Sequence, residues 1–435
     1  MQTIKYQKPE RLLIKNANYL DPAEGGPRQV DVLIENGTIV RVEHAIDGVD
    51  GAETIDGTGK LLTPGWLDMH VHFREPGRED EETVKSGCAA ATAGGFTGAC
   101  PMPNTEPAAD TRGIIEYMIA EAKGTPVDVY PIAAATKGRK GRELSEMADL
   151  IEGGAVAFSD DGVAIATAEM ARRAMEYASM FDVPIIEHCE EPSMTEGGAM
   201  NESAVSTRLG LPGMPGVAED IIVARDILLT EITGARLHIA HISTARSVEL
   251  VRQAKQRGLP VTCEVTPHHF TLTDEAVASY DANLKMNPPL RTQNDVDAII
   301  EGLADGTIDV IATDHAPHSP EEKDVEFQAA PFGIIGLETA LGLIMTQLVE
   351  PGHLRLEEAL HKITLAPRNI LRLPHPKLAV GQVANLTLFD PKHEWTVEAS
   401  RFYSKSRNTP FLGWTLRGRV HAVINKGFLW VSPDV

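Results

Sequence analysis

Cysteine is scarce in this sequence, which has four in 435 residues and no C-x-x-C pair. Each one lies in or beside an apolar segment, so we expect buried reduced thiols rather than disulfides or a thiolate metal site. These residues are Cys88, Cys100, Cys189 and Cys263. Runs of about 18 apolar residues and a signal-peptide pattern are also missing. The sequence therefore predicts a cytoplasmic protein with no membrane-spanning segment.

Positive charge is also scarce. The sequence has 40 Lys and Arg residues against 62 Asp and Glu residues, which gives a net charge of -22. Binding to nucleic acid or to an anionic membrane surface needs clustered Lys and Arg, so we exclude both partners. A small anionic substrate needs only local positive charge. Metal ions and one well-placed arginine would supply it.

The two ends of the chain both carry short strand patterns. Asn36-Gly37 separates the β-rich segments 32–35 and 38–42, which is typical of a two-residue hairpin. Near the C-terminus, the segments 384–389 and 420–424 are strand patterns of the same kind. Neither end has enough strands to bury a face alone. We therefore expect residues 1–63 and 371–435 to form one small β-sandwich domain, with residues 64–370 inserted between them.

The middle of the chain alternates apolar, Val- and Ile-rich runs with longer helical patterns, which predicts a parallel α/β sheet. Eight candidate strands can be counted, at 67–72, 96–102, 127–133, 155–159, 184–188, 236–241, 260–265 and 309–313. Eight such units predict a (β/α)8 TIM-like barrel, whose reactive groups gather at the carboxyl ends of its strands.

Polar residues stand at the ends of most of these candidate strands. His70 and His72 are two positions apart, so both imidazoles point to the same side of the first strand. The other strand ends carry Asn104, Asp160 and Asp161, His188, His241 and Asp314. Because all of these positions lie at the same rim of a barrel, we expect one site there.

Imidazoles and carboxylates together suit Zn2+, and they are more numerous than one ion needs. Two ions sharing a bridging hydroxide and a bridging carboxylate, from Asp160 or Asp161, would use them all. The residues alone do not choose between these two. Asp314 is placed to bind one ion, take the proton of the attacking hydroxide and pass it to a leaving nitrogen.

Arg74 lies two residues beyond His72 and is placed to fork onto a substrate carboxylate, with an ordinary surface arginine as the alternative. His318 and Asn287 are further candidates, on loops stiffened by proline. By strand parity we expect His238 to face the helices. His268 and His269 are expected to support the site from behind, and no role is assigned to His353, His361, His375, His393 and His421.

Seven polar motifs follow one another along the chain: His70-Val71-His72-Phe73-Arg74-Glu75-Pro76-Gly77, Pro101-Met102-Pro103-Asn104-Thr105, Phe158-Ser159-Asp160-Asp161-Gly162, Glu187-His188-Cys189-Glu190, His238-Ile239-Ala240-His241-Ile242-Ser243, Asn287-Pro288-Pro289-Leu290-Arg291 and Thr313-Asp314-His315-Ala316-Pro317-His318. In this order, the chain resembles the class I dihydroorotases of the amidohydrolase superfamily over nearly its whole length. Dihydropyrimidinases and allantoinases share some of the motifs, but the runs 73–77 and 287–291 together are typical of dihydroorotases.

The resemblance implies the reversible cyclisation of N-carbamoyl-L-aspartate to L-dihydroorotate plus water, in de novo pyrimidine (UMP) biosynthesis. It implies two Zn2+ ions per subunit, with Asp161 as the bridge and Asp314 as ligand and general acid/base. The remaining implied metal ligands are His70 and His72 on one ion and His188 and His241 on the other. The implied substrate contacts are His72, Arg74, Asn104 and His318, and Asn287 with the backbone around Phe332 and Gly333. A homodimer, or an assembly with aspartate transcarbamoylase, is an expectation from the family alone.

One departure from the wider superfamily bears on this interpretation. Many relatives bridge their metals with a carboxylated lysine after the fourth strand, whereas residues 154–165 contain no lysine. Bacterial class I dihydroorotases are similar in using aspartate there. Two alternatives stay open: another cyclic amidase such as an allantoinase, and a non-catalytic scaffold for aspartate transcarbamoylase. Scaffold chains typically lose metal ligands, and here every expected ligand is present.

Overall fold

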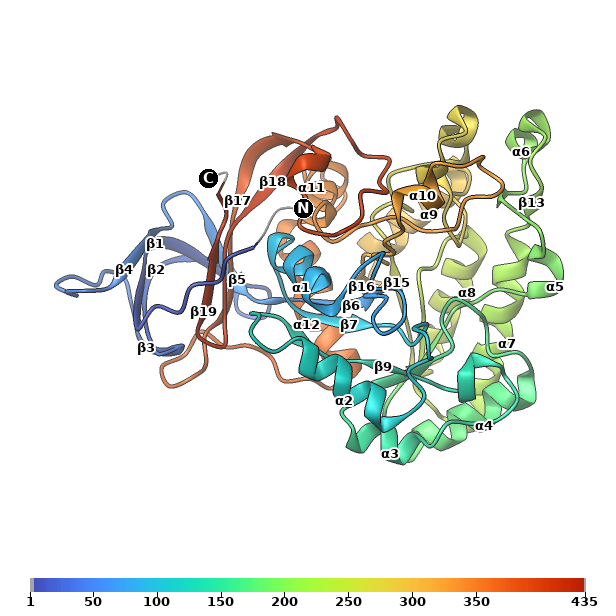
Figure 1. Cartoon of the computed structure of the whole chain (residues 1–435), viewed down its shortest axis with the longest axis horizontal. Helices are drawn as coiled ribbons and strands as arrows, with labels where there is room; N and C mark the ends of the chain where they lie inside the picture. Colours follow the sequence, from blue (N-terminus) through green and yellow to red (C-terminus); the bar gives the residue numbers. More distant parts are fainter. Residues whose placement is uncertain (1–3, 434–435) are drawn as a thin grey trace.

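Strands from both ends of the chain form one eight-stranded sheet in the computed structural model, which describes residues 4–433. The strands are β1 (Arg11–Asp21), β2 (Gly25–Glu35), β3 (Thr38–Glu43), β4 (Glu53–Asp56), β5 (Leu61–Pro64), β17 (Asn385–Thr396), β18 (Thr415–Asn425) and β19 (Phe428–Val431). β5 pairs with both β1 and β17, so it joins the N-terminal strands to the C-terminal ones. Figure 1 shows this sheet beside the larger α/β body.

The interior of this sheet domain agrees with the predicted meeting of the two termini. Apolar residues from β1, β2 and β3 cluster with apolar residues from β17, β18 and β19. The predicted hairpin is confirmed, since Asn36 and Gly37 have φ values of 49° and 79° and Glu35 pairs with Thr38. The strands are hydrogen-bonded into one continuous sheet, because β5 joins the N-terminal and C-terminal halves.

Parallel strands form the barrel, as the sequence predicted. They are β6 (Trp66–Val71), β7 (Phe96–Pro101), β8 (Asp128–Val129), β9 (Ile132–Ala134), β10 (Ala157–Ser159), β11 (Ile185–Glu187), β14 (Leu237–Ile239), β15 (Val261–Val265) and β16 (Val310–Ile311). The ring closes where the backbone N–H of His72 donates to the carbonyl of His315 at 2.8 Å.

The expected third strand is split into β8 and β9. Pro131 lies between the two pieces, and it has no N–H with which to continue a ladder. Before the break, Tyr130 donates to the carbonyl of Ala99 in β7, and after it Val156 donates to the carbonyl of Pro131. The segment therefore changes partners at the proline without breaking the ring.

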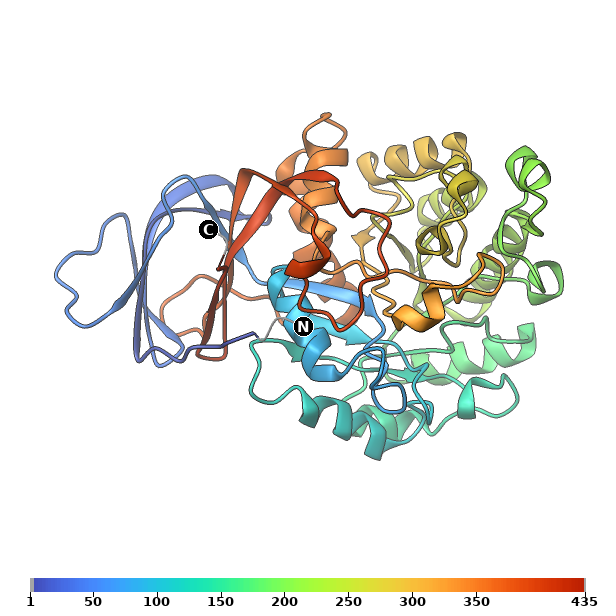
Figure 2. The same cartoon turned by 45° about the horizontal axis from the view of Figure 1, so that its top comes forward.

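Helices surround the barrel on its outer side (Figure 2). They are α1 (Val84–Ala93), α2 (Arg112–Glu121), α3 (Met147–Glu152), α4 (Ala168–Ser179), α7 (Val217–Thr233), α8 (Ala245–Gln256), α9 (Gln293–Ala304), α11 (Ala340–Ile344) and α12 (Leu356–Leu371). α4 illustrates their local logic, since Thr167 caps its first turn and its buried residues recur at helical spacing: Ala171, Ala174, Met175 and Ala178.

Longer connections sit on the rim where the barrel strands end. The connection after β11 holds α5 (Pro192–Thr195), β12 (Met200–Asn201), α6 (Ala204–Leu209) and β13 (Gly213–Met214), and α10 (Pro320–Lys323) follows β16. The segment between β17 and β18 leaves the sheet and reaches toward α10 in both views (Figures 1 and 2). Within residues 4–433, no helix combines the length and apolar character that a membrane span requires. The four cysteines are buried and unpaired, as predicted.

Candidate active site

The two histidines at the end of β6 face two carboxylates. Nε2 of His70 lies 3.5 Å from Oδ1 of Asp161 and 3.5 Å from Oδ1 of Asp314. Nε2 of His72 lies 2.9 Å from the same Asp314 oxygen and 3.6 Å from Oδ2 of Asp161. Both imidazoles are buried. The parity argument made from the sequence therefore describes their directions correctly.

The histidines that follow β11 and β14 meet Asp161 from the other side. Nδ1 of His188 lies 3.6 Å, and Nε2 of His241 lies 3.5 Å, from Oδ1 of Asp161. The two ring nitrogens are 3.0 Å apart. Asp161 thus stands between the pair on β6 and the pair His188 and His241.

The neighbouring carboxylate, Asp160, is engaged elsewhere. Its oxygens accept hydrogen bonds from the backbone N–H of Thr136 at 3.0 Å and from the Thr136 hydroxyl at 2.5 Å. Adjacent residues at a strand end point to opposite sides, so only one of the two can face the imidazoles. Of the two carboxylates, Asp161 is the one that faces the four imidazoles.

Two buried ligand atoms at the centre of this cluster lack a hydrogen-bond partner within the described part of the chain, as expected where a metal ion binds. Nε2 of His70 and Oδ1 of Asp161 have no hydrogen-bond partner among residues 4–433, and both are deeply buried. Among residues 4–433, three groups have ligand atoms within 4.8 Å of one another. Two of them lie in this cluster, His70 with Asp161 and His241, and His70 with His72 and Asp314, while the third joins Glu81, His318 and Glu322. Bonds of about 2.0 to 2.1 Å to one tetrahedral ion hold neighbouring ligand atoms about 3.4 Å apart. The observed separations fit divalent cations.

The far nitrogens of three of these histidines are each held by an acceptor. Nδ1 of His70 lies 2.6 Å from Glu264, Nδ1 of His72 lies 2.7 Å from the Asn104 side-chain oxygen, and Nε2 of His188 lies 3.1 Å from Glu190. An acceptor on one ring nitrogen places the proton there and leaves the other nitrogen's lone pair for a metal. Sequence reasoning missed Glu264 and Glu190, and gave Asn104 only a substrate contact.

The cluster is built to hold positive charge. Burial alone would lower the pKa of His188, but Asp161 and Glu190 raise it to about 10. Burial alone would raise the pKa of Asp161, but His70, His188 and His241 hold it well below its usual range. The pKa of Asp314 is lowered in the same way, by His70 and His72 against the effect of burial. Such a charge balance suits a bound cation.

A cavity of about 280 Å³ opens over these ligands. Every residue predicted to contact the substrate lines it: His72, Arg74, Asn104, Asn287, His318, Phe332 and Gly333. Arg74 is largely buried, so the alternative of an ordinary surface arginine is wrong. Its Nε lies 3.1 Å from Glu81 and its Nη2 lies 3.3 Å from Nε2 of His318. The cavity wall therefore includes the Arg74 guanidinium, which Glu81 and His318 keep in place.

The other predicted residues form the walls of this cavity. Nδ2 of Asn287 donates to Glu190 at 2.5 Å, beside His188. The carbonyl of Phe332 lies 2.7 Å from Nε2 of His318. Gly333 has a φ of 118°, and a Cβ atom there would lie 2.6 Å from that of Ala316. Only glycine fits this close approach of two loops.

His238 corrects one expectation. It does not face the helices, because its Nε2 lies 3.2 Å from Glu264, which itself binds His70 inside the barrel. The parity argument failed because β14 ends at Ile239 and His241 has a φ of 30°, which breaks the strand alternation. His269 bonds to Thr266 and to the carbonyl of Pro288, and its support of the site stays a prediction.

Three residues of the site have left-handed backbone conformations. The φ values are 61° for Arg74, 30° for His241 and 48° for Asp314. Side chains other than glycine seldom adopt this region, and such residues gather where function needs a particular direction. Here the turns direct the three side chains into the cavity at points where a regular strand would not.

The parallel barrel, the β-domain from both termini and the His and Asp cluster at the carboxyl rim define a TIM-barrel hydrolase of the amidohydrolase class. Solved structures share this fold. The L-hydantoinase (dihydropyrimidinase) from Arthrobacter aurescens superimposes with a TM-score of 0.85 at 24% identity, covering 96% of this chain and 95% of that one. The D-hydantoinase (dihydropyrimidinase) from Thermus sp. gives 0.79 at 24% identity, covering 98% and 96%.

The particular family follows from sequence relatives. The family model described as Dihydro-orotase-like matches residues 59–247. The dihydroorotase of Pelotomaculum thermopropionicum is 53% identical over 417 residues, which are 96% of this chain and 97% of that protein. The dihydroorotase of Syntrophus aciditrophicus is 48% identical over 426 residues, covering 98% and 100%. The chain belongs to the dihydroorotase family.

Proposed function

We propose that this chain is a class I dihydroorotase, which interconverts N-carbamoyl-L-aspartate and L-dihydroorotate in de novo pyrimidine biosynthesis. The observation that carries the proposal is the cavity of about 280 Å³, which is lined both by the largely buried Arg74 and by Asp161, whose Oδ1 has no hydrogen-bond partner among residues 4–433. The class I subtype is supported by Asp161 in the bridging place, in a stretch without lysine.

L-Dihydroorotate is a cyclic amide with one carboxylate on its ring, and the cavity offers a partner for each part. Arg74 and His318 at one end, with the amide of Asn104 beside them, would bind the carboxylate. Asn287 and the backbone at Phe332 and Gly333 would hold the ring. The scissile amide then lies toward Asp161 and Asp314.

Two Zn2+ ions are the cofactors that this donor set favours. His70, His72 and Asp314 would hold one ion, His188 and His241 the other, and Asp161 both. When bound, such ions lower the pKa of a water molecule and polarise the carbonyl group that it attacks. Glu264, Asn104 and Glu190 keep the imidazoles in the tautomers that bind metal.

Asp314 handles the proton in this proposal. During hydrolysis, the water oxygen bonds to the ring carbonyl carbon, and the Asp314 carboxylate takes a proton from that water. The C–N amide bond breaks, and Asp314 gives the proton to the leaving nitrogen. The second water proton is released as the new carboxylate ionises. Cyclisation runs through the same steps in reverse.

The physiological setting is also part of the proposal. The proposed substrate is a small anion. The net charge of -22 does not support binding to nucleic acid or to a membrane. We propose a cytoplasmic enzyme that acts as a homodimer or together with aspartate transcarbamoylase.

A substrate comparison tests the proposal. The purified protein is assayed with L-dihydroorotate, allantoin and hydantoin, with metal content measured before and after chelation. We expect turnover of dihydroorotate to exceed that of the other two, to disappear with the metal and to return with added Zn2+. Faster turnover of allantoin or hydantoin would favour another cyclic amidase, and metal-replete protein without turnover would favour a scaffold.

A further inference from the structure

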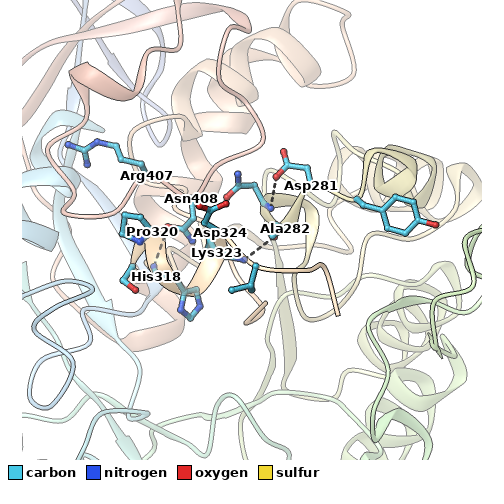
Figure 3. A pocket seen from close by; sticks show the side chains of 12 residues that line it. Asp281, Ala282, His318, Pro320, Lys323, Asp324, Arg407 and Asn408 are labelled. Carbon is cyan, nitrogen blue, oxygen red and sulfur yellow. Dashed lines mark hydrogen bonds between the residues drawn. The ribbon is translucent and has the colours of Figure 1, made fainter. Parts of the chain in front are cut away.

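We propose that Asn408, on the segment between β17 and β18, is a positioning residue for recognition of the substrate carboxylate. The inference rests on the proposed function and adds a residue that lies outside the barrel and outside the catalytic cavity. Asn408 is 4% exposed. Figure 3 shows it beside His318, at the wall of a second cavity of about 400 Å³.

The Asn408 side chain uses its full amide to join two loops. Its Nδ2 donates to the carbonyls of Ala316 at 3.0 Å and Gly333 at 3.1 Å. Its Oδ1 accepts from the backbone N–H of His318 at 3.2 Å. All three partners line the catalytic cavity, although Asn408 itself does not. The amide therefore ties the loop after β16 to the loop that carries Gly333.

The same segment also holds the acid behind Arg74 and His318. The hydroxyl of Ser406 donates to the carbonyl of Glu81 at 2.8 Å. The two carboxylate oxygens of Glu81 contact different residues. Oε1 lies 2.8 Å from Nδ1 of His318, and Oε2 lies 3.1 Å from Nε of Arg74. The segment thus reaches both carboxylate-binding side chains, one through Glu81 and one through the backbone of His318.

This arrangement separates substrate binding from the metal centre. The contacts of Asn408 and Ser406 lead to Arg74, His318 and Gly333, and none of the hydrogen bonds described for them within residues 4–433 reaches a metal ligand. A misplacement of about 1 Å in the groups that hold a substrate can cost on the order of 100-fold in kcat/KM. Where those groups bind the ground state and the transition state equally, the loss appears in KM. Loosening Asn408 should therefore weaken the hold on the carboxylate while the chemistry at Asp161 and Asp314 continues.

The test compares two matched substitutions, Asn408→Asp and Asn425→Asp. Asn425 is also a buried asparagine of the C-terminal part, 2% exposed, and its Nδ2 donates to the carbonyls of Thr97 and Pro126, among residues that do not line the cavity. Each change replaces a donor by an oxygen that faces the acceptor oxygens of the parent, which for Asn425 include the Asp128 carboxylate at 2.9 Å. Asn408→Ser is the milder second variant, in case Asn408→Asp does not fold.

For Asn408→Asp or Asn408→Ser we expect KM for L-dihydroorotate to rise roughly tenfold or more, with kcat within about threefold of the parent and metal content unchanged. Inhibition by orotate, a ring with the carboxylate, should weaken by the same factor. Inhibition by dihydrouracil, a ring without it, should not change. Asn425→Asp should lower the melting temperature and leave KM as it was.

The inference is overturned if KM stays within about twofold of the parent in the Asn408 variants. It is overturned equally if inhibition by dihydrouracil weakens as much as inhibition by orotate, or if kcat and metal content fall together. A parent protein without dihydroorotate turnover would instead overturn the proposed function, and this inference with it.

Discussion

Nδ1 of His70 lies 2.6 Å from Oε1 of Glu264, and this contact turns the opposite ring nitrogen toward Asp161 and Asp314. Glu264 is fully buried, and its other oxygen lies 3.2 Å from His238. Burial would raise the pKa of Glu264, but His70 and His238 lower it to about 2. The carboxylate is thus ionised and can only accept, which fixes the His70 tautomer.

Glu264→Gln should therefore weaken metal binding without removing a ligand. An amide in this place loses the charge that sets the basicity and direction of His70, and such changes typically cost about 10- to 100-fold in metal affinity. The measurement is Zn2+ occupancy in a chelator titration. Thr262→Val is the control, since Thr262 contacts His238 and not His70. Equal metal affinity in Glu264→Gln and the parent would contradict this role.

The adjacent pair Asp160 and Asp161 provides a second, internally matched prediction. Asp161→Asn removes the charge between the two histidine pairs, so we expect metal affinity to fall by more than about 100-fold and turnover with it. Asp160→Asn should keep the metal and lose about 1 to 3 kcal/mol of stability, because it weakens the bonds to Thr136. Metal analysis and thermal unfolding of both variants decide. Metal loss in Asp160→Asn alone would reverse the assignment.

Asp314→Asn tests the proton carrier apart from the metal. The asparagine oxygen can still face His70 and His72, but the amide cannot take up a proton. We expect kcat to fall about 10²- to 10⁴-fold while metal content is largely kept. Asp309→Asn, directly before β16 and paired with Lys255, should leave kcat close to the parent value. Turnover retained in Asp314→Asn would eliminate the proposed role.

Much of the barrel and of its rim could be predicted because the information is local. Each strand is a short apolar run that can be found in the sequence. In a (β/α)8 barrel the carboxyl ends of all strands lie at one rim, so His70, His188 and Asp314 could be assigned to that rim with no knowledge of their contacts. The hairpin at Asn36 and Gly37 could be predicted from these two residues alone, because both readily adopt a positive φ. The predicted metal and substrate roles remain predictions that the experiments above examine.

The rest of the site depends on contacts that local patterns do not carry. Glu81 stands in the charged run 78–82, which is typical of a solvated loop, yet it is 2% exposed and binds Arg74 and His318. Asn408 comes from the far end of the chain, through a segment with no motif of its own. Glu264 did leave a signal, since it is the one charged residue in the apolar strand Val261–Val265.

Arg74→Lys tests the recognition of the substrate carboxylate directly. A guanidinium can donate to Pro317 and still fork onto a carboxylate, whereas an ammonium offers a single point charge. The loss of one charge-assisted hydrogen bond, about 1.5 to 3 kcal/mol, corresponds to a rise in KM of roughly 10- to 150-fold. We expect kcat and metal content to change little, since a guanidinium has no lone pair to offer a metal ion. Arg172→Lys on α4, where Arg172 pairs with Glu176 at 2.9 Å, is the matched control and should leave KM unchanged. Steady-state kinetics with L-dihydroorotate measures both variants. A fall in kcat at constant KM would mean that Arg74 acts on the reacting amide and not on the carboxylate.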